Sequence, residues 1–408
     1  MFHRVHTAHP FIRKTARPNS LTKGFEALGI HTLIREFASS ILGIFFPVFL
    51  YQLGGSIRFV LFFAIAYYAL VFLLEPIGVR VMTHVGLKWA MTIGMGSYVC
   101  LYFLLAMHAL FPLWMVFVLS VGLYVLAHTT YWVPYHTEFA ETAPRRNLGA
   151  AISILGVGTA LLGVLAPAAA GALITWAGFP ALLAATGVVL LISLIPVSSL
   201  SVLRERYKYG FFETFHILFA RRHRTLLFVY VAEGVESFVS MWIWPLFLFL
   251  LLRGNFIQVG VLAAGILAMC VFLRMTVGHA IDRHKGHGLF HLGTGLYSVG
   301  WMMKAFVATA SQVFLVGTYH GFASIMMRTP FDAIMYSRAA DAGHYVDEYT
   351  ALREMALVVG RVIAGVALLL SLQWVGFSVA FAFAAIASIG LGFASEITSK
   401  LQPAKERG

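Results

Sequence analysis

One apolar stretch of the chain decides its fold class. Residues 147–203 read NLGAAISILGVGTALLGVLAPAAAGALITWAGFPALLAATGVVLLISLIPVSSLSVL, with no Asp, Glu, Lys or Arg, and residues 89–137 also lack all four residue types. A helix needs about 20 apolar residues to cross the roughly 30 Å core of a bilayer, so each stretch has room for two crossings and a turn. Residues 181–195 lack the alternation of a barrel strand, so helices are the expected spanning element.

The composition extends this conclusion to the whole chain. Hydrophobic residues make up 60% of the 408 positions and charged residues 11%, whereas soluble domains are roughly half apolar and a quarter charged. We therefore predict an all-α integral membrane protein with about twelve transmembrane helices. The spans are expected near residues 29–52, 57–78, 89–108, 112–134, 148–175, 179–200, 225–251, 256–276, 289–309, 312–335, 350–371 and 374–395.

Basic residues are distributed unevenly between the two sides of these spans. Of the 29 Lys and Arg, 21 lie before the first span, in alternate loops or after the last span, whereas the opposite loops hold only Arg58 and Arg253. The positive-inside rule then predicts a multi-pass protein of the cell membrane with both termini in the cytoplasm. Topology accounts for the formal net charge of +12, so we expect the lipid bilayer and no nucleic acid as a partner. The polar, basic residues before the first span predict no cleavable signal peptide.

The longest polar interruption divides the chain into two halves. Residues 201–224 are expected to form a basic cytoplasmic linker between two six-helix bundles, residues 29–200 and 225–395. A basic cytoplasmic N-terminus, residues 1–28, and a cytoplasmic tail, residues 396–408, complete the predicted organisation.

Similar features recur about 200 residues apart. The matched pairs are Pro47-Val-Phe-Leu with Pro245-Leu-Phe-Leu, Pro134-Tyr-His with Pro330-Phe-Asp, and loop residue Gly86 with Gly286. Because each half holds an even number of spans, the two bundles are predicted to form a parallel repeat.

The loops that follow spans 2 and 8 carry a further pattern, Gly-x-x-x-Asp-Arg-x-Gly-Arg. Its second copy is found at Gly278, Asp282, Arg283 and Gly286, with one extra residue before the last Gly. Its first copy keeps Gly86 and Lys88 but has Thr83 and His84 in place of Asp and Arg. With this motif the chain resembles the major facilitator superfamily over nearly its whole length. The resemblance implies that spans 1, 4, 7 and 10 line a central cavity.

Span 5 adds a weaker similarity. Residues 163–171 partly match the Gly-Pro-x-x-Gly-Gly pattern of antiporters in that family. The alternative interpretation is a small-residue surface that lets two helices approach closely.

Three ionisable residues are expected deep in the membrane, where charge is costly unless it meets a partner or water. Glu233, Glu236 and Arg361 lie roughly 10 to 20 Å from the cytoplasmic end at about 1.5 Å per residue. Glu233 and Glu236 are three residues apart on one face of span 7, and two adjacent carboxylates cannot both ionise cheaply there. We predict that these three residues couple protons or bind substrate. The alternative is a fixed strut in which Arg361 or Arg35 pairs with the carboxylates.

A second set of ionisable residues is expected nearer the cytoplasm, as an inner gate. Its members are Arg35, Glu36, His136, Glu138, Arg328, Asp332, Arg353 and Glu354. Arg328 and Asp332 are four residues apart and are predicted to neutralise each other. Lys304 in span 9 is expected to extend its ammonium towards an interface.

Aromatic residues lie among these charges. Tyr131 in span 4 and Trp242 in span 7 are predicted ligand contacts, with packing and interfacial anchoring as the alternative.

Histidines suggest a different class of protein. His279, His284, His287 and His291 cluster in sequence, and the last two have the spacing at which two imidazoles share a metal ion on a helix. A membrane-embedded metal enzyme is therefore one alternative, and a transporter-like receptor that binds its ligand without turnover is another.

The favoured prediction is a secondary transporter that moves a small solute by alternating access, coupled to protons, with an exporter or antiporter as one form of it. The sequence has no glycine-rich phosphate loop followed by Lys-Ser or Lys-Thr, so ATP hydrolysis is not expected. We predict no enzymatic activity, no cofactor, no bound metal and a monomer.

Overall fold

The chain folds almost entirely into helices. The computed structural model describes residues 18–142, 148–203, 207, 209–283, 287–341 and 346–394. These residues form helices and no strands. The prediction of an all-α protein is therefore confirmed.

The first bundle comes from the N-terminal part of the chain. Its helices are α1 (Pro18–Leu42), α2 (Phe46–Gly54), α3 (Ile57–Val85), α4 (Leu87–Ala106), α5 (Leu113–Thr142) and α6 (Leu148–Ser198).

The second bundle follows the short helix α7 (Phe211–Leu218). Its elements are α8 (Arg224–Phe238), the π-helix η3 (Val239–Ile243), α9 (Trp244–Leu251), α10 (Phe256–Arg283), α11 (His287–Lys304), α12 (Ala310–Asp341), α13 (Val346–Val375) and α14 (Phe377–Leu391).

The number of membrane crossings follows from these helices. Among the described residues, seven helices are long and apolar enough to cross a bilayer, or eight if α1 and α2, bent by 42°, count as one. The 51-residue α6 holds two crossings, because Gly178 breaks it with a φ of 78°. Together with α11, α12 and α14, the count reaches the twelve that the apolar runs predict.

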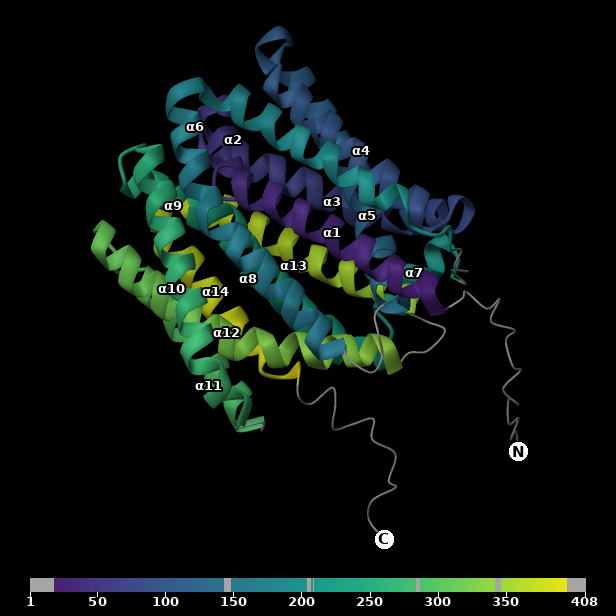
Figure 1. Cartoon of the computed structure of the whole chain (residues 1–408). Helices are drawn as coiled ribbons and strands as arrows, with labels where there is room; N and C mark the ends of the chain where they lie inside the picture. The colour runs from purple at the N-terminus through teal and green to yellow at the C-terminus, as the bar shows by residue number, and fades with distance from the viewer. Residues whose placement is uncertain are drawn as a thin grey trace.

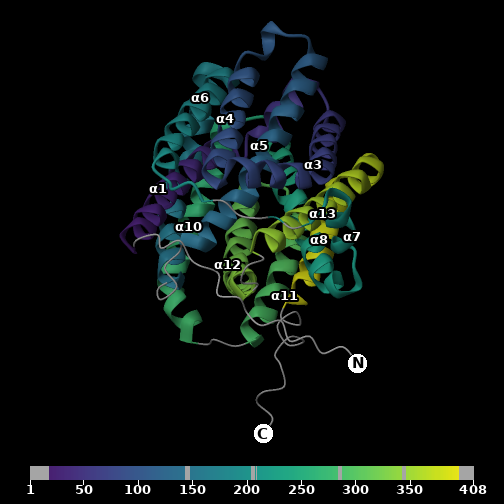
Figure 2. The ribbon, with the colours of Figure 1, turned by 90° about the vertical axis from the view of Figure 1, so that its right-hand side faces the viewer.

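The two bundles lie side by side. In Figure 1 the helices α1 to α6 occupy one side of the molecule and α8 to α14 the other, and Figure 2 keeps this division after a rotation of 90°. We call the side that carries α7 the linker side. The opposite side, where the chain turns at Gly55, Gly178 and Gly376 with positive φ, is the far side.

The repeated prolines have equivalent structural positions. Pro47 lies in the first turn of α2, and Pro245 lies in the first turn of α9, in each case just after a break in the first span of its bundle. Pro134 lies inside α5, and Pro330 lies inside α12. Proline is tolerated in a first turn because that N–H has no helical partner, so the matched breaks are encoded locally.

The bundles approach most closely where α6 meets α10 near the far side. A Cβ added at Gly171 would lie 2.3 Å from the carbonyl oxygen of Phe256, and one at Gly260 would lie 2.2 Å from that of Pro167. Only glycine permits such backbone contact. The small-residue stretch of span 5 therefore packs the two bundles together, as the alternative interpretation expected.

The linker contains a packed helix. Phe215 of α7 lies edge-on against Phe72 of α3, with ring centroids 5.2 Å apart, and Thr214, Ile217 and Leu218 are buried. The exact domain boundaries given by the sequence stay predictions.

Candidate functional site

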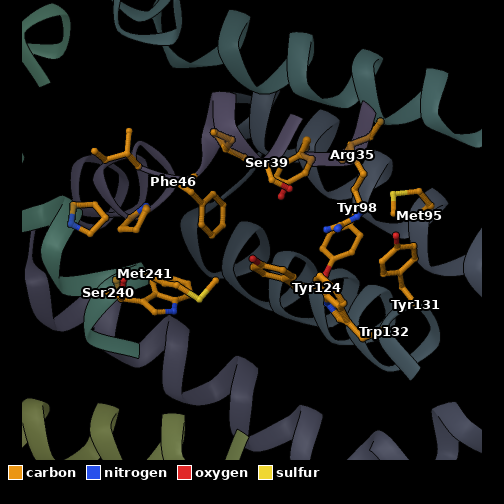
Figure 3. Close-up of a pocket in the computed structure, with 18 of the residues that line it drawn as sticks. Arg35, Ser39, Phe46, Met95, Tyr98, Tyr124, Tyr131, Trp132, Ser240 and Met241 are labelled. Atoms are coloured by element: carbon orange, nitrogen blue, oxygen red, sulfur yellow. The ribbon is translucent and has the colours of Figure 1, made fainter. Parts of the chain in front are cut away.

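A cavity of about 450 Å³ lies between the bundles. Its walls come from α1, α2, α4, α5, α6, η3 and α9. Eight of the lining residues are aromatic, namely Phe46, Tyr98, Tyr102, Tyr124, Tyr131, Trp132, Trp242 and Trp244. Of the described residues that line it, Arg35 alone carries a full charge, and Figure 3 shows its side chain among these rings. This volume is typical of a small-molecule site.

Two irregular segments border the cavity. The chain bends between α1 and α2, and Gly43 and Ile44 of this bend line the cavity. From the other bundle, Ser240, Met241 and Trp242 of the π-helix η3 line it. A π-helical turn widens the backbone and is frequent at functional sites.

Arg35 is held by aromatic rings. It is 7% exposed, and its guanidinium carbon lies 5.7, 4.9 and 5.3 Å from the ring centroids of Tyr131, Trp132 and Tyr135. Arg35 also forms an ion pair with the neighbouring Glu36. Cation–π contacts of this kind stabilise a guanidinium that has left water. Arg35, predicted in the gate, therefore lies at the wall of the cavity.

Both predicted aromatic contacts are fixed by hydrogen bonds. His31 donates from Nδ1 to the Ser193 carbonyl at 2.9 Å, so its Nε2 accepts from the Tyr131 hydroxyl at 2.7 Å. The indole of Trp242 donates to the Tyr68 hydroxyl at 3.1 Å. These bonds preorganise the two rings at the cavity.

The carboxylates of α8 meet an arginine from α12. Arg328 donates to Glu233 Oε1 at 3.1 Å and to Glu236 Oε2 at 2.6 Å. Tyr297 of α11 donates to Glu236 Oε1 at 2.5 Å. Glu236 is fully buried and Glu233 is 6% exposed, whereas the Arg328 side chain is 32% exposed. The site is therefore a buried acidic pair with one partly accessible counter-charge.

The identity of that partner corrects the sequence analysis. The strut alternative named Arg361 or Arg35, but Arg328 occupies this position. Arg361 instead donates from Nε to Ser237 at 3.2 Å and lies over the Tyr68 ring at 5.1 Å. The predicted partner Asp332 lies on α12, and its side chain is outside the described residues.

Another group of ionisable residues lies between α5 and α13. Glu354 forms an ion pair with Arg353 at 2.9 Å and lies 3.8 Å from His128 Nε2 and 3.9 Å from His136 Nε2. His128 Nδ1 is 2.6 Å from the Tyr67 hydroxyl. This group joins the first bundle to the second.

Glu75 is one of the ionisable residues that the sequence analysis missed, as are His31 and His128. It is fully buried in α3, and among the described residues neither carboxyl oxygen has a hydrogen-bond partner. It lies within electrostatic range of Glu354 on α13. An acidic residue inside an apolar span, next to Pro76, is the sequence feature that could have identified it.

The predicted inner gate is thus divided among several places. Arg35 lines the cavity while Glu36, its ion-pair partner, lies outside the lining. Arg328 lies with the acidic pair, and His136, Arg353 and Glu354 lie between α5 and α13. Glu138 is buried near the end of α5.

The loop motif is only partly described. Gly86 joins α3 to α4 with a φ of 89°, and Lys88 donates to the Ser198 carbonyl. Gly278, Asp282 and Arg283 lie on α10, but the side chains of Asp282 and Arg283 are outside the described residues, as is all of Gly286.

The prediction for Lys304 is wrong. Its side chain does not reach an interface but is buried, 3.8 Å from the Trp301 ring centroid and 4.4 Å from that of Trp244. The two indoles replace water around the ammonium.

Only one of the four clustered histidines has a described side chain. His291 has an exposed side chain on α11, whereas the side chains of His279, His284 and His287 lie outside the described residues. Within the described residues, no group of three or more His, Cys, Asp or Glu is arranged to hold a metal ion.

Two bundles of spans around a central cavity define the class as a membrane transport protein. The profile of the Major Facilitator Superfamily matches residues 28–346, and the chain belongs to this family of secondary transporters. The resemblance drawn from the loop motif is confirmed. Membership also favours transport over the metal-enzyme alternative.

Solved structures support the same fold. A crystal structure of a peptide transporter POT in complex with sulfate superposes with a TM-score of 0.68 at 12% identity, covering 93% of this chain and 95% of that one. A mutant of a peptide transporter POT, also in complex with sulfate, gives 0.68 at 11% identity with the same coverage. No curated protein matches the chain in sequence.

Proposed function

We propose that this protein is a proton-coupled secondary transporter that carries a small solute through the central cavity by alternating access. The observation that supports this most is the buried pair Glu233 and Glu236 held by Arg328. Charges buried in a membrane protein are costly and typically mark proton or substrate pathways.

One carboxyl oxygen of the acidic pair is available to accept a proton. Glu233 Oε2 is buried and, among the described residues, has no hydrogen-bond partner. Protonation of either carboxyl removes one of the two negative charges that hold Arg328. The ion pair that ties α12 to α8 is then weaker, and a charge pair must be weakened before the helices that carry it can separate.

The acidic pair and the cavity are connected through one span. Glu236 precedes Trp242 by six residues, about 9 Å along a helix, and Trp242 lines the cavity. A change at the pair therefore reaches the solute through η3, a π-helical turn whose backbone can rearrange more easily than a regular helix. This link is the proposed route of coupling.

The orientation of the protein in the membrane is also part of the proposal. The excess of basic residues on the linker side supports the proposal that this side, and both termini, lie in the cytoplasm. Proteolysis of the linker in sealed vesicles of known orientation tests this assignment.

Reconstitution tests the function. Purified protein is first screened for thermal stabilisation by metabolite classes at two pH values, and stabilising solutes are then added to proteoliposomes that contain a pH-sensitive dye. We expect such solutes to drive proton movement with the wild type and not with Glu236→Gln. The matched control is Glu213→Gln, because Glu213 caps α7 in the linker, away from the spans.

Two outcomes contradict the proposal. Solute movement without proton movement in the wild type removes proton coupling. Proton movement at the wild-type rate in Glu236→Gln removes the acidic pair from the mechanism.

A further inference from the structure

The electrostatics of the cavity restrict its ligand. Arg35 is the charged member of the described lining, and no carboxylate is among those residues. A cationic ligand would meet the like charge of Arg35 without a neighbouring counter-charge in the wall, which is unfavourable in a low dielectric. An anion would gain a charge-assisted contact instead.

Arg35 keeps donors for such a contact. A guanidinium carries five N–H donors. Glu36 pairs with one terminal nitrogen, but the Glu36 side chain is 36% exposed and does not line the cavity. The Nε group of Arg35 is buried and, among the described residues, has no hydrogen-bond partner. Because this atom exposes almost no surface, the contact with a ligand falls to a terminal nitrogen of the guanidinium.

Flat aromatic surfaces form a large part of the cavity wall. Tyr131 and Tyr135 stack at 5.5 Å with 16° between their planes, and Tyr98 and Tyr102 stack at 6.4 Å and 14°. Tyr124 lies edge-on to Tyr98, with ring centroids 5.6 Å apart. In Figure 3 the Arg35 side chain extends from α1 towards the labelled rings of Tyr98, Tyr131 and Trp132. A planar apolar ligand can therefore stack or meet ring edges while its acidic group reaches Arg35.

We propose that the cavity binds a small aromatic carboxylate, with the carboxylate on Arg35 and the ring between Tyr98, Tyr124 and Trp242. This inference rests on the proposed function, since it names the class of solute for the same cavity. It requires no covalent step and no cofactor.

Calorimetry on the full chain in nanodiscs, without a proton gradient, tests the inference. The probes are naphthoate, its neutral amide naphthamide, its cationic counterpart naphthylmethylammonium, and cyclohexanecarboxylate, which keeps the charge but not the aromatic ring. We expect naphthoate to bind about 10- to 100-fold more tightly than naphthamide, which is the usual value of a charge-assisted hydrogen bond. Naphthylmethylammonium should not bind, and cyclohexanecarboxylate should bind more weakly than naphthoate.

Variants assign the effect to Arg35. Arg35→Gln should reduce the affinity for naphthoate to that for naphthamide, and Arg35→Lys, which keeps the charge, should retain part of the difference. The matched control is Arg253→Gln, because Arg253 is an exposed arginine in the far-side turn. The comparison among probes uses the wild type alone, so it remains decisive if a variant fails to fold.

Either of two results would contradict the proposed ligand class. Equal or tighter binding of naphthylmethylammonium, or unchanged naphthoate binding in Arg35→Gln, overturns the inference. Glu236→Gln separates this inference from the proposed function: we expect that variant to bind naphthoate while moving no protons. In the wild type, naphthoate binding without proton movement contradicts only the proposed function, and solute-driven proton movement without naphthoate binding contradicts only the inference.

Discussion

The two bundles differ in how they neutralise the charges near the centre of the molecule. In the first bundle, Arg35 pairs with its half-exposed neighbour Glu36, is surrounded by aromatic rings and forms part of the cavity wall. In the second bundle, Glu233 and Glu236 are neutralised by Arg328 from another helix. Rings cannot exchange protons with Arg35, whereas a carboxylate pair can gain or lose one. The comparison suggests that the first bundle mainly contacts the solute and the second mainly responds to the proton.

Removing Arg328 should have the largest effect. Arg328→Gln leaves two buried carboxylates without their counter-charge, and breaking a buried pair typically costs about 3 to 5 kcal/mol. We expect lower thermal stability in detergent and no proton-coupled transport. The second substitution Glu236→Gln should restore part of the stability. If Arg328→Gln is as stable as the wild type, Arg328 does not neutralise the pair, and the contrast between the bundles is lost.

Forcing the bundles apart should have the next largest effect. Gly260→Ala places a methyl group 2.2 Å from the Pro167 carbonyl oxygen, so α6 and α10 must separate. Such overpacking costs about 1 to 3 kcal/mol, which shifts a conformational equilibrium roughly tenfold. We expect slower transport with the acidic pair intact, measured in proteoliposomes. Gly96→Ala is the control, because a Cβ there has no neighbour within 4 Å. Equal rates in the two variants would argue against a close α6–α10 contact in the cycle.

Glu75 lies in α3 of the first bundle, outside both the cavity wall and the acidic pair, and tests whether an ionisable group there is costly. Among the described residues this buried carboxyl has no hydrogen-bond partner, so replacing it with an apolar residue of similar length, Glu75→Met, should raise the stability by about 1 to 3 kcal/mol. The measurement is a thermal-shift assay. A fall in stability would mean that Glu75 has a partner, and a rise without loss of transport would make it dispensable.

The smallest effect is expected in the first bundle. Tyr131→Phe removes one neutral hydrogen bond to His31, worth about 1 kcal/mol. Solute affinity should fall a few-fold, while the dependence of transport on pH should stay as in the wild type. A changed pH dependence would show that the first bundle also takes part in proton coupling.

The sequence could place those features that depend on a short segment of the chain. The breaks at Pro47 and Pro245 are local, so their equivalence was visible as a repeat. Tyr131 and Trp242 were predicted ligand contacts, and both line the cavity. Whether they touch a ligand stays a prediction.

Arg328 was assigned to the inner gate because span 10 was expected to end near residue 335. The helix α12 continues to Asp341, so Arg328 lies about 20 Å from its linker-side end, close to the depth of about 18 Å that Glu236 has on α8. Small errors in helix ends therefore changed the predicted partner. Lys304 shows the same limit, because no pattern in its own span reveals that Trp244 lies against it.

By itself, the sequence determined the helical membrane fold, the twofold repeat and the set of charges in the spans, because bilayer thickness acts on each segment separately. Tertiary structure alone decided that Arg328 neutralises the acidic pair, that Arg35 lies in an aromatic wall and that Glu75 has no partner among the described residues. Each of these depends on the rotation and depth of two or more helices packed together, and helix packing is set by contacts between distant segments.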